Sequence, residues 1–149
     1  MRALRSRSPE RGAAALEFAL VAPVLILMIM GMVDFGMVVN AQAVVANGAR
    51  DGARVASLNG SEANARAAAL KSASSLGGAA PTVSVQCFTD ITATTPCTGA
   101  NYDVAKAAGN IVRVTVTYTY TWITPLPTWI GRGPTQTISK VSFMRIEST

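Results

Sequence analysis

Two features of the sequence have residue types and spacing that could do chemistry. The first is Glu17, a carboxylate near the start of the apolar run RGAAALEFALVAPVLILMIMGMV, which covers residues 11–33. The second is the pair Cys87 and Cys97, with nine residues between them. An ionisable side chain inside a membrane segment costs free energy and is usually paired, whereas two cysteines outside the cytoplasm can form a disulfide. The first feature indicates charge pairing near lipid, and the second indicates a covalent cross-link.

Glu17 lies about one helical turn into the apolar run, and two roles for its carboxylate are open. It could extend to the cytoplasmic surface or occupy the favourable field of a helix N-terminus. Alternatively, cleavage between Gly12 and Ala13 would create a terminal ammonium, with a pKa of about 8, at the head of the apolar helix. Two such helices, offset by several residues, would pair the amine of one with Glu17 of the other and relieve the desolvation of both charges. The carboxylate would then set the registry of an assembly.

The two cysteines lie downstream of the apolar run. The four arginines among the first 11 residues hold that end of the chain in the cytoplasm, so the cysteines are expected in an oxidising compartment. A Cys87–Cys97 bridge would add roughly 2.5–3 kcal/mol in the chain-entropy model, and two free thiols are the alternative. No metal site is expected, because the chain contains no histidine and two cysteines alone do not form a zinc site.

Composition argues against two classes of function. The chain has 149 residues and a net charge of +5, of which the residues before Gly12 supply +3. This basic balance is explained by membrane topology and does not predict nucleic-acid binding. Without histidine, a GxSxG motif or a phosphate-binding loop, no acid/base or nucleophile pair can be assembled. We therefore expect no catalysis and no cofactor.

A long helix is predicted to position Glu17. Residues 13–33 contain no other charge and would span roughly 32 Å as a helix, the thickness of one bilayer core. Beyond Asp34 the pattern becomes amphipathic, and a continuous helix over 13–58 would be about 69 Å long. Its apolar side in this second part consists of Val38, Ala41, Val45, Ala49, Ala53 and Ala56.

Three positions in this helix are irregular. Pro23 removes the hydrogen bond to the carbonyl of Ala19, which membrane helices tolerate, and it predicts either a local kink or a hinge. Gly48 and Gly52 have the spacing of close helix contacts. Self-association and packing against the chain's own β-rich half are both compatible with this spacing.

After Leu58 the sequence predicts an α+β domain. Ser61 is a suitable N-cap for a short helix over 61–76, which would cover one face of a small antiparallel sheet of about three strands. The strands are predicted at 82–88, 111–122 and 136–146 from their alternation, with a bulge in the last.

The segment WITPLPTWIGRGP, between the last two predicted strands, is a loop by its proline and glycine content. Its two tryptophans, Trp122 and Trp129, have two readings. They could cover the edge of the core, or form an exposed contact surface for a partner subunit or a membrane interface.

The residues around the apolar run are similar to those of a known family. Gly12, followed by Ala-Ala-Ala-Leu, Glu17 and Phe18, resembles the class III signal of type IV pilin-like proteins, in which a prepilin peptidase cuts after the glycine. The stretch 11–58 more closely resembles the TadE/TadG-like pseudopilins of tight-adherence (Flp) pilus systems. The matching residues are Arg11-Gly12, Glu17-Phe18, Pro23, Asp34-Phe35-Gly36 and the run from Gly48 to Arg54.

The resemblance implies a division of the chain into three parts. Residues 1–12 would be a basic cytoplasmic leader, cleaved after Gly12 and followed by N-methylation of Ala13. Residues 13–58 would be the transmembrane and extended helix, and residues 59–149 an extracytoplasmic domain. Phe18 stands where major Flp pilins usually carry tyrosine, and the chain is longer than those subunits, which favours a pseudopilin.

The resemblance also implies a function and partners. The protein would be a non-catalytic minor pilin, held as a single-pass protein in the bacterial inner membrane and serving cell adhesion through a pilus. Its partners would be other pilin or pseudopilin subunits, the prepilin peptidase, the inner-membrane assembly platform and the lipid bilayer.

An ordinary secreted or membrane-anchored protein, unrelated to pili, is the alternative. Ala41-Gln42-Ala43 fits the small-residue site of signal peptidase, and cleavage there would release a product that starts at Val44. Such a signal would be 43 residues long and would carry Asp34 and Asn40 between its apolar core and the cleavage site, which disfavours this reading.

Overall fold

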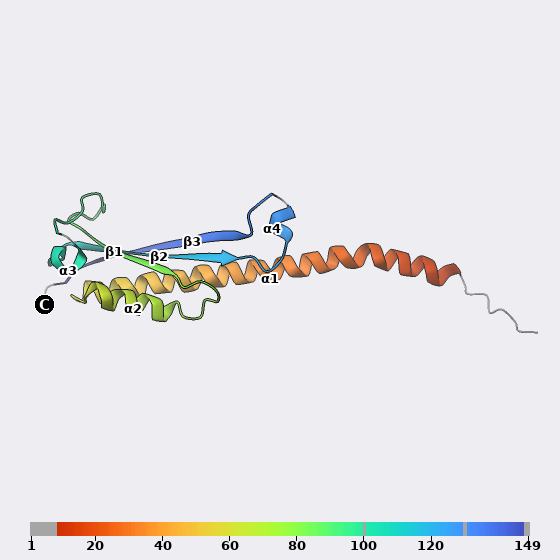
Figure 1. Cartoon of the computed structure of the whole chain (residues 1–149), viewed down its shortest axis with the longest axis horizontal. Helices are drawn as coiled ribbons and strands as arrows, with labels where there is room; N and C mark the ends of the chain where they lie inside the picture. Colours follow the sequence, from red (N-terminus) through yellow and green to blue (C-terminus); the bar gives the residue numbers. More distant parts are fainter. Residues whose placement is uncertain (1–8, 100, 130, 148–149) are drawn as a thin grey trace, which may run out of the picture.

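One helix runs through the molecule, and the other elements pack along its C-terminal half (Figure 1). The computed structural model describes residues 9–99, 101–129 and 131–147. Of the leader predicted over 1–12, residues 1–8 lie outside the described residues, and the last four belong to the helix. The elements in order are α1 (Pro9–Ser57), α2 (Glu62–Ser72), β1 (Thr82–Phe88), α3 (Tyr102–Ala105), β2 (Ile111–Thr121), α4 (Leu126–Trp129) and β3 (Thr135–Arg145). The predicted α+β class is confirmed.

The helix α1 contains 49 residues and is therefore about 74 Å long. It ends in a left-handed turn in which Asn59 has φ of 60° and the amide of Gly60 donates to the carbonyl of Val55 at 3.1 Å. This pattern satisfies a carbonyl of the last turn. The predicted apolar side is confirmed, because its six side chains are all buried: Val38, Ala41, Val45, Ala49, Ala53 and Ala56.

The three strands form an antiparallel sheet in the order β1-β2-β3. Alternate side chains of the central strand β2 are buried, as its pattern predicted. The helix α1 packs on β2 and β3, whereas α2 lies beside α1 and contacts β1. The prediction that the helix over 61–76 would cover the sheet was therefore wrong for most of its area. The small side chains on α1 let the longer helix approach the strands closely.

The bulge predicted in the third strand was wrong. All of β3 is described, and it pairs with β2 in one continuous register, from Ile111 opposite Arg145 to Thr121 opposite Thr135. Ile138 faces the core, whereas Val141 is 48% exposed on the opposite face. The hydrophobic pattern departs from period two because this strand carries apolar residues on both faces.

Gly48 and Gly52 of α1 lie against α2. A Cβ atom on Gly48 would be 2.9 Å from the backbone oxygen of Ala69. One on Gly52 would be 3.1 Å from the backbone oxygen of Ala65 and from a methyl group of Val114. Both glycines therefore allow close contact within one molecule, between α1, α2 and the sheet.

We predict that Gly48→Ala destabilises the domain even though alanine favours helix. The gain in helix propensity is about 1 kcal/mol, and the overpacking against the Ala69 backbone costs about 1–3 kcal/mol. The free energy of unfolding should fall in denaturant titrations of the detergent-solubilised protein, followed by near-ultraviolet circular dichroism. Gly36→Ala is the matched control, because a Cβ atom there meets nothing within 4 Å. Equal stabilisation by both substitutions would contradict the tight contact.

Candidate assembly interface

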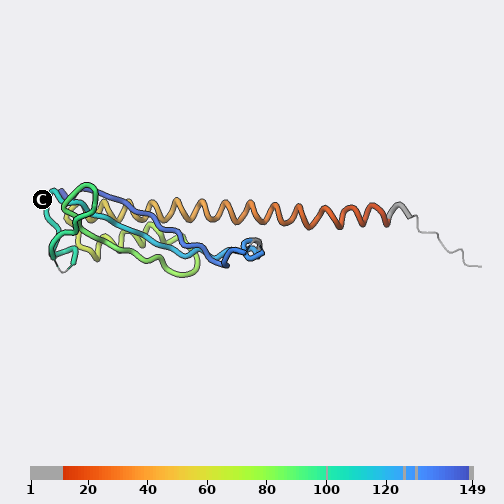
Figure 2. Tube along the Cα trace, turned by 90° about the horizontal axis from the view of Figure 1, so that it is seen from above, coloured from red at the N-terminus to blue at the C-terminus, as the bar shows by residue number. Residues whose placement is uncertain are grey.

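Residues 12–33 of α1, hereafter the exposed segment, extend away from the domain (Figure 2). None of the side chains described between 12 and 33 is buried. Phe18 is 73% exposed and Leu25 is 55% exposed. The mean hydropathy of the most apolar window is 2.4, so α1 is long and apolar enough to cross a membrane. An apolar surface of this extent requires a cover of lipid or of other helices.

The predicted processing and registry residues lie at the start of the exposed segment. Gly12 and Ala13 are in the first turns of α1, and a Cβ atom on Gly12 would meet nothing within 4 Å. Glu17 and Phe18 are exposed. Among the described residues Glu17 has no hydrogen-bond or ion-pair partner. No described group of the chain pairs with Glu17. Its charge is therefore available to a group of another molecule or to a newly formed chain end.

Pro23 also lies in the exposed segment. The helix continues through Pro23 without interruption, and the proline side chain is exposed. The missing hydrogen bond to Ala19 is thus accommodated inside one continuous helix.

Asp34 marks the point where α1 changes from exposed to buried. It is the first buried residue among the described side chains of α1 and is 4% exposed. Its carboxylate accepts hydrogen bonds from the amides of Ile123 and Thr124, each at 3.2 Å, and from the Thr124 hydroxyl. The Tyr120 hydroxyl donates to it at 3.4 Å. We call this set of hydrogen bonds the Asp34 clamp.

The Asp34 clamp fixes the end of β2 to the helix. The pKa of Tyr120 is raised above its usual range. Burial is the largest cause, and the negative charge of the nearby Asp34 is the second. Tyr120 therefore stays protonated and available as a donor. Sequence reasoning assigned Asp34 no role, because its partners lie 86–90 residues away. The available signal was an isolated acid directly after an apolar run.

The tryptophan loop, residues 122–134, follows the clamp. Trp122 is partly buried, and its ring meets that of Tyr120 edge-on, with centroids 5.5 Å apart. Trp129, in contrast, is 67% exposed. The two tryptophans therefore have different surroundings. A cavity of about 320 Å³ lies between the loop and α1, with Gly31 and Pro127 among its lining residues.

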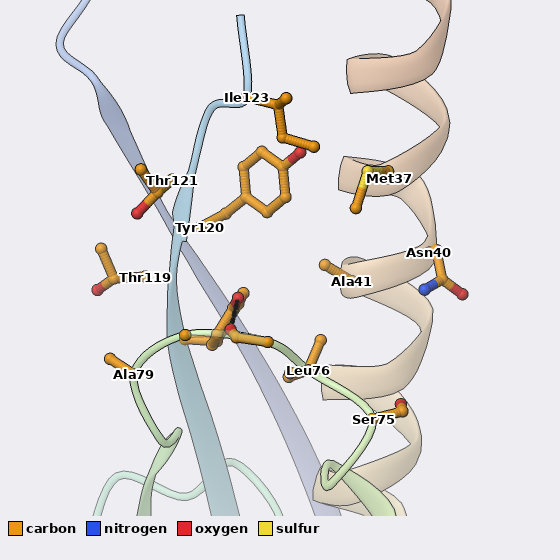
Figure 3. A pocket seen from close by; sticks show the side chains of 13 residues that line it. Met37, Asn40, Ala41, Ser75, Leu76, Ala79, Thr119, Tyr120, Thr121 and Ile123 are labelled. Carbon is orange, nitrogen blue, oxygen red and sulfur yellow. Dashed lines mark hydrogen bonds between the residues drawn. The ribbon is translucent and has the colours of Figure 1, made fainter.

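A second cavity of about 320 Å³ opens between α1, the turn after α2 and β2 (Figure 3). Met37 and Ala41 line it from the helix, and Tyr120 and Ile123 from the strand and the loop. The Tyr118 hydroxyl donates to the carbonyl of Gly77 at 2.5 Å, which ties the turn to the sheet. The described residues contain no group of three or more His, Cys, Asp or Glu that could hold a metal ion.

Cys87 and Cys97 form a disulfide with an S–S distance of 2.01 Å. The loop between them is organised by Asp90, which accepts hydrogen bonds from the amides of Thr94 and Thr95. These hydrogen bonds, chiefly that from the Thr94 amide, hold the pKa of Asp90 well below its usual range. The disulfide loop lies at the opposite end of the sheet from α4 (Figure 1), so it is remote from the exposed segment.

The alternative cleavage site, Ala41-Gln42-Ala43, lies within the packed part of α1. Ala41 is 3% exposed and belongs to the core. Cleavage before Val44 would remove Asp34, Val38 and Ala41 from the domain, together with the clamp. A signal-peptidase product would therefore lose part of its own core.

We predict that Asp34→Ala releases the start of the tryptophan loop. The substitution removes the acceptor of two backbone amides, and each buried donor left unsatisfied costs about 1–3 kcal/mol. Hydrogen exchange of the Ile123 and Thr124 amides should become about tenfold faster or more, measured by mass spectrometry on the detergent-solubilised protein. Asp51→Ala is the control, since Asp51 is exposed on the same helix and bonds the Ser72 hydroxyl instead. Unchanged exchange at both amides would contradict the clamp.

Comparison with known proteins adds one finding to this geometry. Residues 12–54 match the family model of the TadE-like proteins. No curated protein and no solved structure matches the chain. The matched residues comprise the exposed segment, Asp34 and the part of α1 that carries Gly48 and Gly52. The resemblance predicted from the sequence is thereby confirmed: over residues 12–54 the chain is similar to the TadE-like family of proteins associated with Tad pili.

Proposed function

We propose that this protein is a minor pilin, or pseudopilin, of a Tad-type pilus. In this role it is a non-catalytic structural or assembly component, processed by a prepilin peptidase and held in the inner membrane before assembly. The observation that carries the proposal is the exposed segment itself. It is an apolar helix, matched by the TadE-like family model, and it projects from a domain whose described buried residues begin only at Asp34.

Processing after Gly12 is compatible with the fold. No buried side chain is described before Asp34, so removal of the leader takes nothing from the described core. A Cβ atom built on Gly12 would meet nothing within 4 Å, so no described element of the domain packs against the proposed cleavage site. The new terminal ammonium of Ala13 would stand about one turn from Glu17 on an exposed helix.

Assembly follows from the same surface. In the membrane, lipid covers the exposed segment, and in a filament the corresponding helices of other pilin subunits take its place. Glu17 then pairs with the terminal amine of a neighbouring subunit, because an unpaired carboxylate between apolar helices would be costly. The membrane platform and the peptidase act on the cytoplasmic end, and the domain stays on the extracytoplasmic side.

The processing step predicts a defined N-terminus. Intact-mass measurement and N-terminal sequencing of the protein from its native host should give a chain that begins at Ala13. Gly12→Leu should leave the chain starting at Met1, whereas Gly36→Leu, a second glycine with open surroundings, should be processed normally. A mature chain that starts at Val44 would support the secreted alternative. A wild-type chain that starts at Met1 would contradict processing.

The registry role predicts a selective assembly defect. Glu17→Ala and Glu17→Gln should both insert into the membrane at normal levels and should both be depleted from isolated filaments, because each loses the negative charge. Membrane fractionation and immunoblotting of sheared filaments measure the two steps. Normal incorporation of Glu17→Gln would show that shape rather than charge matters at this position, and the ion pair would be rejected.

A further inference from the structure

We propose that the tryptophan loop is a membrane-interface anchor, in which Trp129 and Ile123 enter the headgroup region of the extracytoplasmic leaflet. The inference rests on the proposed placement of the exposed segment in a bilayer. It assigns a lipid surface as the partner of a loop that follows β2, far in sequence from the apolar helix.

The tryptophan loop lies beside the part of α1 where the membrane span would end. A hydrocarbon core of about 30 Å takes about 20 helical residues, so a span that starts at Ala13 ends near Met32. Pro127 of the loop lines the same cavity as Gly31, and Thr124 donates to Asp34. The loop thus lies where the helix leaves the hydrocarbon. Figures 1 and 2 show α4 beyond the end of the sheet, toward the exposed segment.

The surface of the tryptophan loop is largely apolar and carries little charge. Trp129 is 67% exposed and Ile123 is 60% exposed. In the parts of the loop that the structure describes, 122–129 and 131–134, Arg132 is the only charged residue. Tryptophan and arginine are the side chains that anchor proteins at the boundary between lipid and water. On the helix, Phe35 is 71% exposed, at the level where α1 leaves the hydrocarbon.

The Asp34 clamp makes this placement compatible with lipid headgroups. An exposed carboxylate at this level would repel phosphate groups, but that of Asp34 is buried and accepts the hydrogen bonds of the loop. The clamp also fixes the start of the loop against α1. The anchor is therefore held at a set depth by the same carboxylate that ties the sheet to the helix.

Quenching of tryptophan fluorescence by brominated lipids tests the proposal. The full-length chain is reconstituted into phosphatidylglycerol and phosphatidylethanolamine vesicles with bromine placed near the headgroup or near the ends of the acyl chains. Trp122→Phe leaves Trp129 as the reporter, and Trp129→Phe leaves Trp122. A third variant combines both substitutions with Leu25→Trp and reports on the middle of the span.

We expect the emission of Trp129 to fall by about half with bromine near the headgroup and less with deep bromine, as for an interfacial side chain. Trp122, which is partly buried, should be quenched less. The tryptophan at position 25 should be quenched most by deep bromine. Quenching at position 25 without quenching of Trp129 overturns the anchor and leaves the membrane placement of α1 standing, whether water or a second protein covers the loop. Absence of quenching at both positions overturns both.

Discussion

Asp34 lies where one continuous helix passes from an apolar exposed segment to a packed core, and the arrangement of the domain depends on its hydrogen bonds. A buried carboxylate is tolerated only when its acceptor positions are filled. Here they are filled by the Tyr120 hydroxyl at the end of β2 and by the amides of Ile123 and Thr124 and the Thr124 hydroxyl just after it. The end of the central strand is thereby fixed to the helix at the boundary. Without this interaction, only apolar packing would hold the sheet to α1 near Asp34, where the packed part of the helix begins.

Further along α1, small side chains replace hydrogen bonds as the determinant. Ala49, Ala53 and Ala56 are nearly or fully buried, and Gly48 and Gly52 bring the backbone of α2 into contact. Alanine contributes little apolar area per residue, so stability comes from close approach over several turns. At the far end, the Tyr102 hydroxyl donates to the carbonyl of Ala56 at 2.8 Å, and the Glu147 amide donates to that of Ser57 at 2.9 Å. Both ends of the packed helix are thus tied to the domain.

Local patterns predicted the elements well, and long-range contacts were the part that could not be predicted. The alternation in 111–122 and the apolar side of α1 each depend on the period of a single element, and both are confirmed. Which helix covers the sheet depends on a comparison between two helices, and that prediction was wrong. In the candidate assembly interface, the exposure of Glu17 could be predicted because the residues around it form an apolar segment of membrane length. The Asp34 clamp joins residues about 90 positions apart, which no local period encodes.

The long helix also lies nearly along the direction of the strands that it covers (Figure 1). A pull on its free end therefore acts parallel to the interface between α1 and the sheet, and many contacts share the load at once. In the perpendicular direction they would separate one after another. In the assembly proposed above, a subunit drawn out of a bilayer or stretched within a fibre would for this reason resist detachment of its domain in shear, because many contacts would have to break together.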